Sequence, residues 1–191
     1  MKRTLMSIAF ALVAALTVAG CGNDGDPNDS SVSGGAQFND ADVTFAQSMI
    51  PHHEQAVEMA TMAQERASSA EVKQLADMFA AAPSPEIDTM TGWLEDWGQD
   101  VSPDAESGME HSGSDESGMM SEDDMESLGA ATGAAFDQMF LEMMIEHHTS
   151  AIEMAKTEQQ DGENPDAIAL AEKIEADQTA EIAEMEDLLG S

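Results

Sequence analysis

The chain has 191 residues, of which 39 are Asp or Glu and only 6 are Lys or Arg, giving a formal net charge of −33. So acidic a surface repels phosphate backbones, which excludes nucleic acid as a partner, and it attracts cations in general. The single cysteine leaves no internal disulfide, so packing must supply the stability.

Residues 1–20 have the pattern of an export signal, with two positive residues followed by an apolar run at 5–19. The run is shorter than the roughly 18 residues that a membrane-spanning helix needs. Residues 18–21, Val-Ala-Gly-Cys, resemble the lipobox of bacterial lipoproteins, whose cysteine is lipid-modified and begins the mature chain. We expect export and a lipid anchor at Cys21, in the periplasm or on the cell surface. An ordinary signal peptide with a chance cysteine is the alternative.

A segment of Gly, Ser, Asn and Asp at 21–38 predicts a flexible tether between the lipid and a folded domain. From 40 to 66 apolar residues recur at helical spacing, which predicts a long amphipathic helix. Ser68 with Glu71 fits a capping box, so a second helix is expected to begin there. These helices belong to a first predicted hairpin, 39–97.

Prolines interrupt the second helix of this hairpin. Pro83 and Pro85 cannot sit inside a regular helix, so a break is expected near them. The order Ser84, Pro85, Glu86 is suited to capping and restarting the helix, which then runs towards the two tryptophans at 93 and 97.

An acidic linker at 98–121, with scattered Met and His, predicts no fixed structure. Ser121, three residues before Asp124, resembles a helix cap, and a long helix is expected over 134–158. A final helix should begin at Asn164-Pro165 and end at Gly190. These elements make up a second predicted hairpin, 122–191.

The two hairpins are related by an internal repeat, because His147 follows His52 by 147 − 52 = 95 residues and the same offset aligns many other residues. Two amphipathic hairpins bury their apolar faces best against each other, so the expected fold is all-α, an antiparallel four-helix bundle. The aligned pairs are Asp42 and Asp137, Phe45 and Phe140, Met49 and Met144, Ile50 and Ile145, His53 and His148, Glu58 and Glu153, Met59 and Met154, Leu75 and Leu170, Glu86 and Glu181, Ile87 and Ile182, and Met90 and Met185.

Both halves contain Met-Ile-x-His-His, at 49–53 and at 144–148. Residues three and four apart share one face of a helix, so each Met lies one turn from its His pair. If the halves pack about a pseudo-twofold axis, four imidazoles and up to four thioethers converge inside the bundle. Burying four imidazoles without a ligand leaves many polar groups to satisfy, which favours a metal site.

The donor types narrow the choice of metal. Imidazole suits copper, zinc, iron and nickel, whereas thioether sulfur favours Cu(I), so copper is the first choice and another transition metal the second. A blue-copper centre would need a cysteine thiolate, and calcium would need an oxygen cage. A di-iron centre would need Glu three residues before His, where Met49 and Met144 stand.

Several further residues are candidates for supporting roles. Met59 and Met154 are secondary ligands or ordinary core, and Glu86 and Glu181 are candidates for orienting the imidazoles. Glu58 and Glu153 either share that role or form a solvated helix face. The linker residues are candidates for an arm that captures Cu(I), with a structureless acidic linker as the alternative. They are Met109, His111, Met119 and Met120, followed by Met125.

Two copies of F-x-x-x-M-I-x-H-H-x-x-A-[VI]-E-M-A, each followed by E-I-x-x-M, resemble the DUF305 family over roughly 40–190. The resemblance implies one ferritin-like four-helix domain at 39–191, export in bacteria, and copper binding with copper tolerance. One departure is that Gln178 precedes Glu181 by three residues, whereas Pro83 precedes Glu86. The ligands implied are Met49, His52, His53, Met144, His147 and His148.

Three functions are therefore open. The first is an extracytoplasmic copper-binding lipoprotein that sequesters the metal. The second is a metal-free helical module that binds a protein partner of unknown identity. The third is a redox enzyme, for which the sequence offers no dedicated acid, base or nucleophile, so we expect no enzymatic activity.

Overall fold

The computed structural model describes residues 37–102 and 118–190, all within one compact unit that spans 34–191. The predicted signal at 1–20, Cys21, most of the tether, Met109 and His111 lie outside the described residues. The described segments form these helices: α1 Asp40–Arg66, α2 Ala70–Ala81, α3 Pro83–Trp97, α4 Glu122–Ala130, α5 Ala134–Asp161 and α6 Pro165–Leu189.

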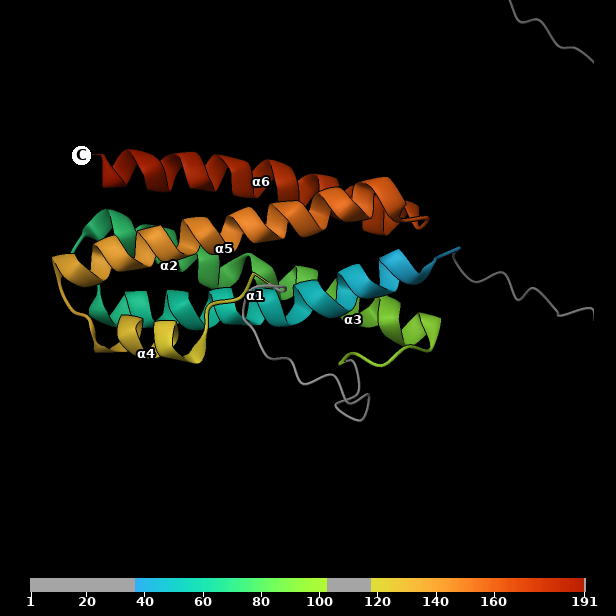
Figure 1. Cartoon of the computed structure of the whole chain (residues 1–191), viewed down its shortest axis with the longest axis horizontal. Helices are drawn as coiled ribbons and strands as arrows, with labels where there is room; N and C mark the ends of the chain where they lie inside the picture. Colours follow the sequence, from blue (N-terminus) through green and yellow to red (C-terminus); the bar gives the residue numbers. More distant parts are fainter. Residues whose placement is uncertain (1–36, 103–117, 191) are drawn as a thin grey trace, which may run out of the picture. The chain divides into compact units, whose positions relative to one another are not determined.

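The helices form an antiparallel bundle with four long arms, which confirms the predicted all-α class (Figure 1). α1 is one arm, α2 and α3 together form the second, and α5 and α6 are the third and fourth. α1 packs on α2, α3 and α5, while α5 packs on α6. α1 and α5 run in opposite directions (Figure 1). The short α4 contacts α5.

The sequence signals place the ends of α1, α5 and α6 correctly or nearly so. Asn39 caps α1 and forms a reciprocal capping box with Asp42. Asn164 caps α6 with Pro165 in its first turn, as predicted, and Gly190 follows its last residue. Ser121 likewise caps α4 through Asp124. α5 continues to Asp161, three residues beyond its predicted end.

The starts of α2 and α3 differ from the sequence predictions. Ser69, and not Ser68, caps α2, because the backbone N–H and hydroxyl of Ser68 donate to the carboxylate of Asp137. α3 begins at Pro83 without a side-chain cap, so the predicted restart at Ser84 is wrong. Proline suits a first helical position, because it has no N–H that would be left unpaired there.

Two repeat-related aspartates fasten the ends of the bundle. Asp42 near the start of α1 accepts the N–H of Asn164 at 2.9 Å, in the turn between α5 and α6. Asp137 near the start of α5 accepts the N–H of Ser69 at 2.9 Å, in the turn between α1 and α2. Each hairpin therefore holds the turn of the other, which gives these aligned aspartates a structural role.

The apolar core is divided into two clusters. The first contains Met59, Phe79, Phe140, Met144 and other residues from the last half of α1 and the first half of α5. The second is built from the opposite halves, including 45–50 of α1 and 151–155 of α5. The histidines of α1 and α5 fall between these stretches in sequence, so a polar layer crosses the middle of the bundle.

No helix among the residues described is long and apolar enough to span a lipid bilayer.

A buried carboxyl pair lies where α1 begins and α5 ends. Glu158 is 1% exposed, and no N–H of a described residue donates to either of its oxygens. Burial, a hydrogen bond with Asp42 and the Asp42 charge raise the pKa of Glu158 to about 8. Burial would also raise the pKa of Asp42, but hydrogen bonds from Glu158 and from backbone N–H groups lower it overall. At neutral pH the pair therefore shares one proton, which Glu158 carries.

Glu158→Gln should change how stability depends on pH. The folded chain keeps a proton on Glu158 that the unfolded chain releases above pH 4.5, so this group makes the wild type less stable as pH rises from 4.5 to about 8. Glutamine donates to Asp42 at every pH. Across that pH range, the free energy of unfolding of the variant should therefore rise relative to that of the wild type by on the order of 3 kcal/mol. Urea unfolding at pH 5 and pH 9 measures the difference.

The exposed Glu153 on the same helix provides the control, as Glu153→Gln removes a charge without touching the buried pair. A Glu158→Gln effect of equal size at both pH values would contradict the shared proton.

Candidate metal centre

Four imidazoles lie together in the middle of the bundle, two from α1 and two from α5. His52 and His147 are 0% and 1% exposed, and His53 and His148 are each 3% exposed. The rings of His52 and His147 stack with centroids 3.6 Å apart, and the rings of His147 and His148 lie 6.3 Å apart. The antiparallel crossing of α1 and α5 therefore brings the two repeated motifs face to face.

The outer imidazoles are held by two repeat-related glutamates. His53 Nε2 lies 2.8 Å from Glu86 Oε2, and His148 Nε2 lies 2.9 Å from Glu181 Oε2. An ionised carboxylate accepts from Nε2–H, which leaves the Nδ1 lone pair of each ring available as a donor to a metal. His148 Nδ1 is buried and has no hydrogen-bond partner among the residues described.

The two glutamates differ in one respect. Lys173 Nζ contacts Glu86 Oε1 at 2.9 Å, whereas the residue 95 positions before Lys173 is Met78, so the other half lacks this lysine. Burial would raise the pKa of Glu86, but hydrogen bonds from His53 and Lys173 lower it overall. Glu86 therefore contacts the histidine layer although Pro83 replaces the glutamine of the other half.

The inner imidazoles have fewer hydrogen bonds. His52 Nε2 lies 2.8 Å from Ser150 Oγ, and its Nδ1 has no partner in the described segments. His147 has no described partner for either ring nitrogen. Burial, followed by the nearby His53 and His148, lowers the pKa of His52 to about 3. Burial and the neighbouring imidazoles also hold the pKa of His147 well below its usual value.

A departure from the repeat explains why His147 lacks a partner. Ser150, which contacts His52, corresponds to Gln55 in the first half. The Gln55 amide does not contact His147; it pairs with the backbone of Met120, at 2.9 Å to its oxygen and 2.7 Å from its nitrogen. Sequence reasoning missed both Ser150 and Gln55, and the only available signal was this mismatch between aligned positions.

The predicted thioethers lie on both sides of the histidine layer. Met49 and Met144 are fully buried, but Met49 belongs to the second core cluster and Met144 to the first. Met59 is fully buried in the first cluster, and Met154 packs partly buried against the second. Each inner histidine therefore has a methionine from its own motif one helical turn away, on opposite sides of the layer.

A small cavity of about 60 Å³ lies beside the layer. Its walls include His53, His147 and His148, together with Glu86 and Glu181. Lys173 and Gln178 also line it, and Gln178 Oε1 is buried without a described partner. Polar groups of all four arms thus line one small, partly open cavity.

The observed geometry is not a closed ligand cage. Within 37–102 and 118–190, no group of three His, Cys, Asp or Glu side chains is arranged to hold a metal ion. The cause is visible in the contacts, because His52 and His147 stack face to face while His53 and His148 direct Nε2 to carboxylates. What the layer offers is two inner imidazoles that burial holds neutral, and unpaired ring nitrogens on His52, His147 and His148.

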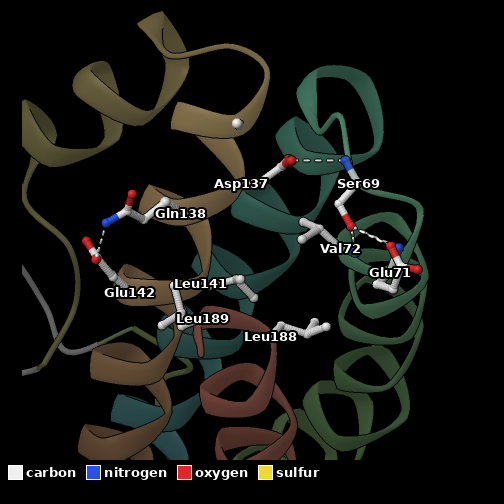
Figure 2. A pocket seen from close by; sticks show the side chains of 10 residues that line it. Ser69, Glu71, Val72, Asp137, Gln138, Leu141, Glu142, Leu188 and Leu189 are labelled. Carbon is white, nitrogen blue, oxygen red and sulfur yellow. Dashed lines mark hydrogen bonds between the residues drawn. The ribbon is translucent and has the colours of Figure 1, made fainter. Parts of the chain in front are cut away.

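A larger hollow of about 670 Å³ lies away from these histidines, where α2 begins and where α5 begins and α6 ends. Figure 2 shows Val72, Leu141 and Leu189 around it, with Asp137 bonded to Ser69 at its edge. Among the residues that the structure describes, no His or Met lines this hollow.

Fold and site define an all-α bundle of two repeated hairpins that enclose a histidine layer. The chain belongs to the DUF305 family, a domain of unknown function, whose profile matches residues 42–189. No curated protein matches the chain significantly.

Solved structures of related proteins share this fold. A DUF305 protein from Streptomyces coelicolor is 32% identical with a TM-score of 0.70, covering 78% of this chain and 92% of that one. A DUF305 fragment from Deinococcus radiodurans is 30% identical with a TM-score of 0.71, and the match covers 80% of this chain and 97% of that one. CopM in its Cu(II)-bound form is 33% identical with a TM-score of 0.67, covering 78% and 95%. CopM has also been solved with Cu(I), with silver and in the apo form.

The inner histidines should stay neutral in mildly acidic solution. The pKa of His52 is lowered to about 3 and that of His147 lies well below the ordinary 6.5, so below pH 6.5 the unfolded chain binds protons that the folded chain does not. The ring signals of His52 and His147 should therefore remain unchanged from pH 8 to pH 5 in an NMR titration. Stability should fall with acidification by up to about 1.4 kcal/mol per pH unit for each ring.

Replacing both inner rings tests the origin of this effect. His52→Phe with His147→Phe keeps a flat aromatic ring at each position and removes the titrating nitrogens, so the loss of stability on acidification should become smaller. A midpoint near 6.5 for either inner ring in the wild type would show that burial does not hold it neutral.

Proposed function

We propose that this protein binds copper in its histidine layer outside the cytoplasm, and so sequesters the metal or confers tolerance to it. The observation that carries the proposal is His147, a buried neutral imidazole whose two ring nitrogens have no described partner. A buried polar group without a hydrogen bond costs about 1–3 kcal/mol, and a bound metal would remove that cost at the nitrogen it binds. Neutral imidazole is also the protonation state that metals require.

The donor set supports copper among the metals that imidazole binds. Each half supplies His and Met three residues apart, as His52 with Met49 and His147 with Met144. Thioether sulfur favours Cu(I) over zinc and hard cations, and Ag(I) shares that softness. The relative CopM, at about a third identity, is described in Cu(I)-, Cu(II)- and silver-bound forms.

Binding would require the layer to rearrange slightly. The stacked rings of His52 and His147 must slide or turn so that their nitrogens address a metal, and the cavity beside them gives room for such a movement. Glu86 and Glu181 would hold the outer rings in a fixed tautomer while this happens. Met49 and Met144 would add sulfur donors from the two sides.

The function proposed is binding, not turnover. Ser150 Oγ lies 2.8 Å from His52 Nε2, but burial lowers the pKa of that imidazole to about 3, which makes it too weak a base to activate the hydroxyl. The other imidazoles contact one another or carboxylates. A metal-free module that binds a protein partner remains the alternative. Elemental analysis of protein purified from copper-supplemented cells separates the two, since only the copper proposal predicts retained metal.

Cu(I) titration of the full-length chain in mild detergent, against a competing chromophoric ligand, tests the site. His52→Phe with His147→Phe should weaken binding by more than the roughly 10- to 100-fold that loss of a supporting outer partner causes. Glu86→Gln, which alters only such a partner, should have the smaller effect.

His111→Phe is the matched control, because it removes the remaining histidine of the sequence, outside the 49–53 and 144–148 motifs. Wild-type affinity in the His52→Phe, His147→Phe variant would refute copper binding by the inner pair. A large loss in His111→Phe instead would move the site to the linker.

We also propose that the protein is exported and attached to a membrane through lipid on Cys21. The lipobox-like sequence 18–21 supports this, and the relative from Streptomyces coelicolor carries the provisional description of a secreted protein. Labelled palmitate supplied to the cells should be incorporated into the wild type and not into Cys21→Ser, because the thiol that would carry the lipid is gone. A wild-type protein that incorporates no label would exclude the anchor.

A further inference from the structure

A second group of thioethers lies on the outside of the bundle. Met119 and Met120 end the linker, and Met143 projects from α5; all three are half-buried and line one groove of about 460 Å³. Asp124, Glu146 and Glu153 complete much of the wall, and among the described residues no Lys, Arg or His lines the groove. The groove is therefore an acidic surface with three sulfur atoms available to it.

The segment before α4 is fixed to the bundle by specific contacts. The Gln55 side chain pairs with both the N–H and the carbonyl of Met120, and Ser150 Oγ donates to the carbonyl of Gly118 at 3.1 Å. Gly118 has a φ of +63°, and a Cβ added there would lie 2.0 Å from Ser150 Cβ. Only glycine permits this approach, so Met119 and Met120 are placed over α5 by the backbone itself.

The repeated fold does not require these methionines. The position of Met143 corresponds to Ser48 in the first half, and Ser48 packs in neither apolar cluster. Met119 is likewise absent from both apolar clusters, although Met120 and Met143 pack at the edge of the first. Packing in the apolar core therefore explains the presence of Met120 and Met143 only in part, and it does not explain Met119.

The groove adjoins the histidine layer through a single side chain. Ser150 lines the groove, and the same hydroxyl lies 2.8 Å from His52 Nε2. A rotation of Ser150 about χ1 would expose this imidazole nitrogen to the groove. An ion held by the methionines would then be one ligand exchange away from a buried imidazole, with no change in oxidation state.

We propose that Met119, Met120 and Met143 form a capture site for Cu(I) at the mouth of the histidine layer. Carboxylates around the groove raise the local concentration of cations, while thioethers select soft monovalent ions such as Cu(I) and Ag(I) over zinc, calcium and magnesium. The direction of transfer, from groove to layer, rests on the proposed copper function. Binding of a soft ion by the groove does not.

The test uses Ag(I), which is stable in air, and the full-length chain labelled with ¹³C at the methionine methyl groups. The first additions of Ag(I) should shift the methyl signals of Met119, Met120 and Met143. Replacing all three by leucine should abolish the shifts assigned to the groove, whereas Met78→Leu, at an exposed methionine of α2, should leave them unchanged. Groove methyls that stay unshifted while Ag(I) binds elsewhere would overturn the proposal.

Gly118→Ala tests the geometry while keeping every sulfur. The added methyl group overlaps Ser150, so the segment must detach and the Ag(I)-induced shifts of Met119 and Met120 should be lost. Shifts of wild-type size in this variant would show that the docked backbone does not form the site. A folded spectrum of the remaining methyl signals confirms that the bundle is intact.

The two proposals fail in different ways. In His52→Phe with His147→Phe, the groove shifts should persist, because the capture site does not use imidazole. If Ag(I) shifts the groove methyls but never the histidine rings of the wild type, the capture site stands and the copper function falls. If it shifts the rings and never the groove, the capture site falls.

Discussion

The structure depends on placing four imidazoles in the middle of a hydrophobic bundle. The crossing of α1 and α5 puts His52 against His147 and separates the core into two apolar clusters. An apolar side chain at these positions would pack at no polar cost, whereas each imidazole brings a nitrogen donor and a nitrogen acceptor that must be satisfied. Glu86, Glu181 and Ser150 satisfy part of this demand, and the unpaired nitrogens that remain define the candidate site.

The chain's acidity and its histidine layer act at different ranges. A charge of −33 concentrates cations around the whole molecule but cannot distinguish one metal from another. The choice among metal ions depends on soft and borderline donor atoms. These are the thioethers of the groove, and the imidazoles and thioethers of the histidine layer inside the bundle. Lys173, held between Glu86 and Asp177, is one of the few cations, and it lies on the wall of the cavity beside the layer. Hydrogen bonds and ion pairs with Asp177 and Glu86 raise the pKa of Lys173, so it stays charged there.

Local signals in the sequence predicted the helices well, because capping and periodicity depend on neighbours in the chain. Asn39, Asn164 and Ser121 cap helices through residues two or three positions away. The predicted cap at Ser68 was wrong because Ser68 donates its N–H and hydroxyl to Asp137, which is 69 residues away in the chain. The repeat pointed to the four histidines and to Glu86 and Glu181, but not to ring stacking, Ser150 or Lys173, since these depend on which side chains meet across helices.

The hydrogen bonds of Asp42 and Asp137 to the opposite hairpin bear on the ancestry of the domain. Since each aspartate holds the turn of the opposite hairpin, one hairpin alone would find the same contacts only by pairing with an identical copy. A symmetric dimer of single hairpins, later fused into one chain, would have this arrangement from the outset. Within a single chain the two halves are free to differ, and Ser150 and Gln55 give the two stacked rings unequal surroundings, which no symmetric dimer could do.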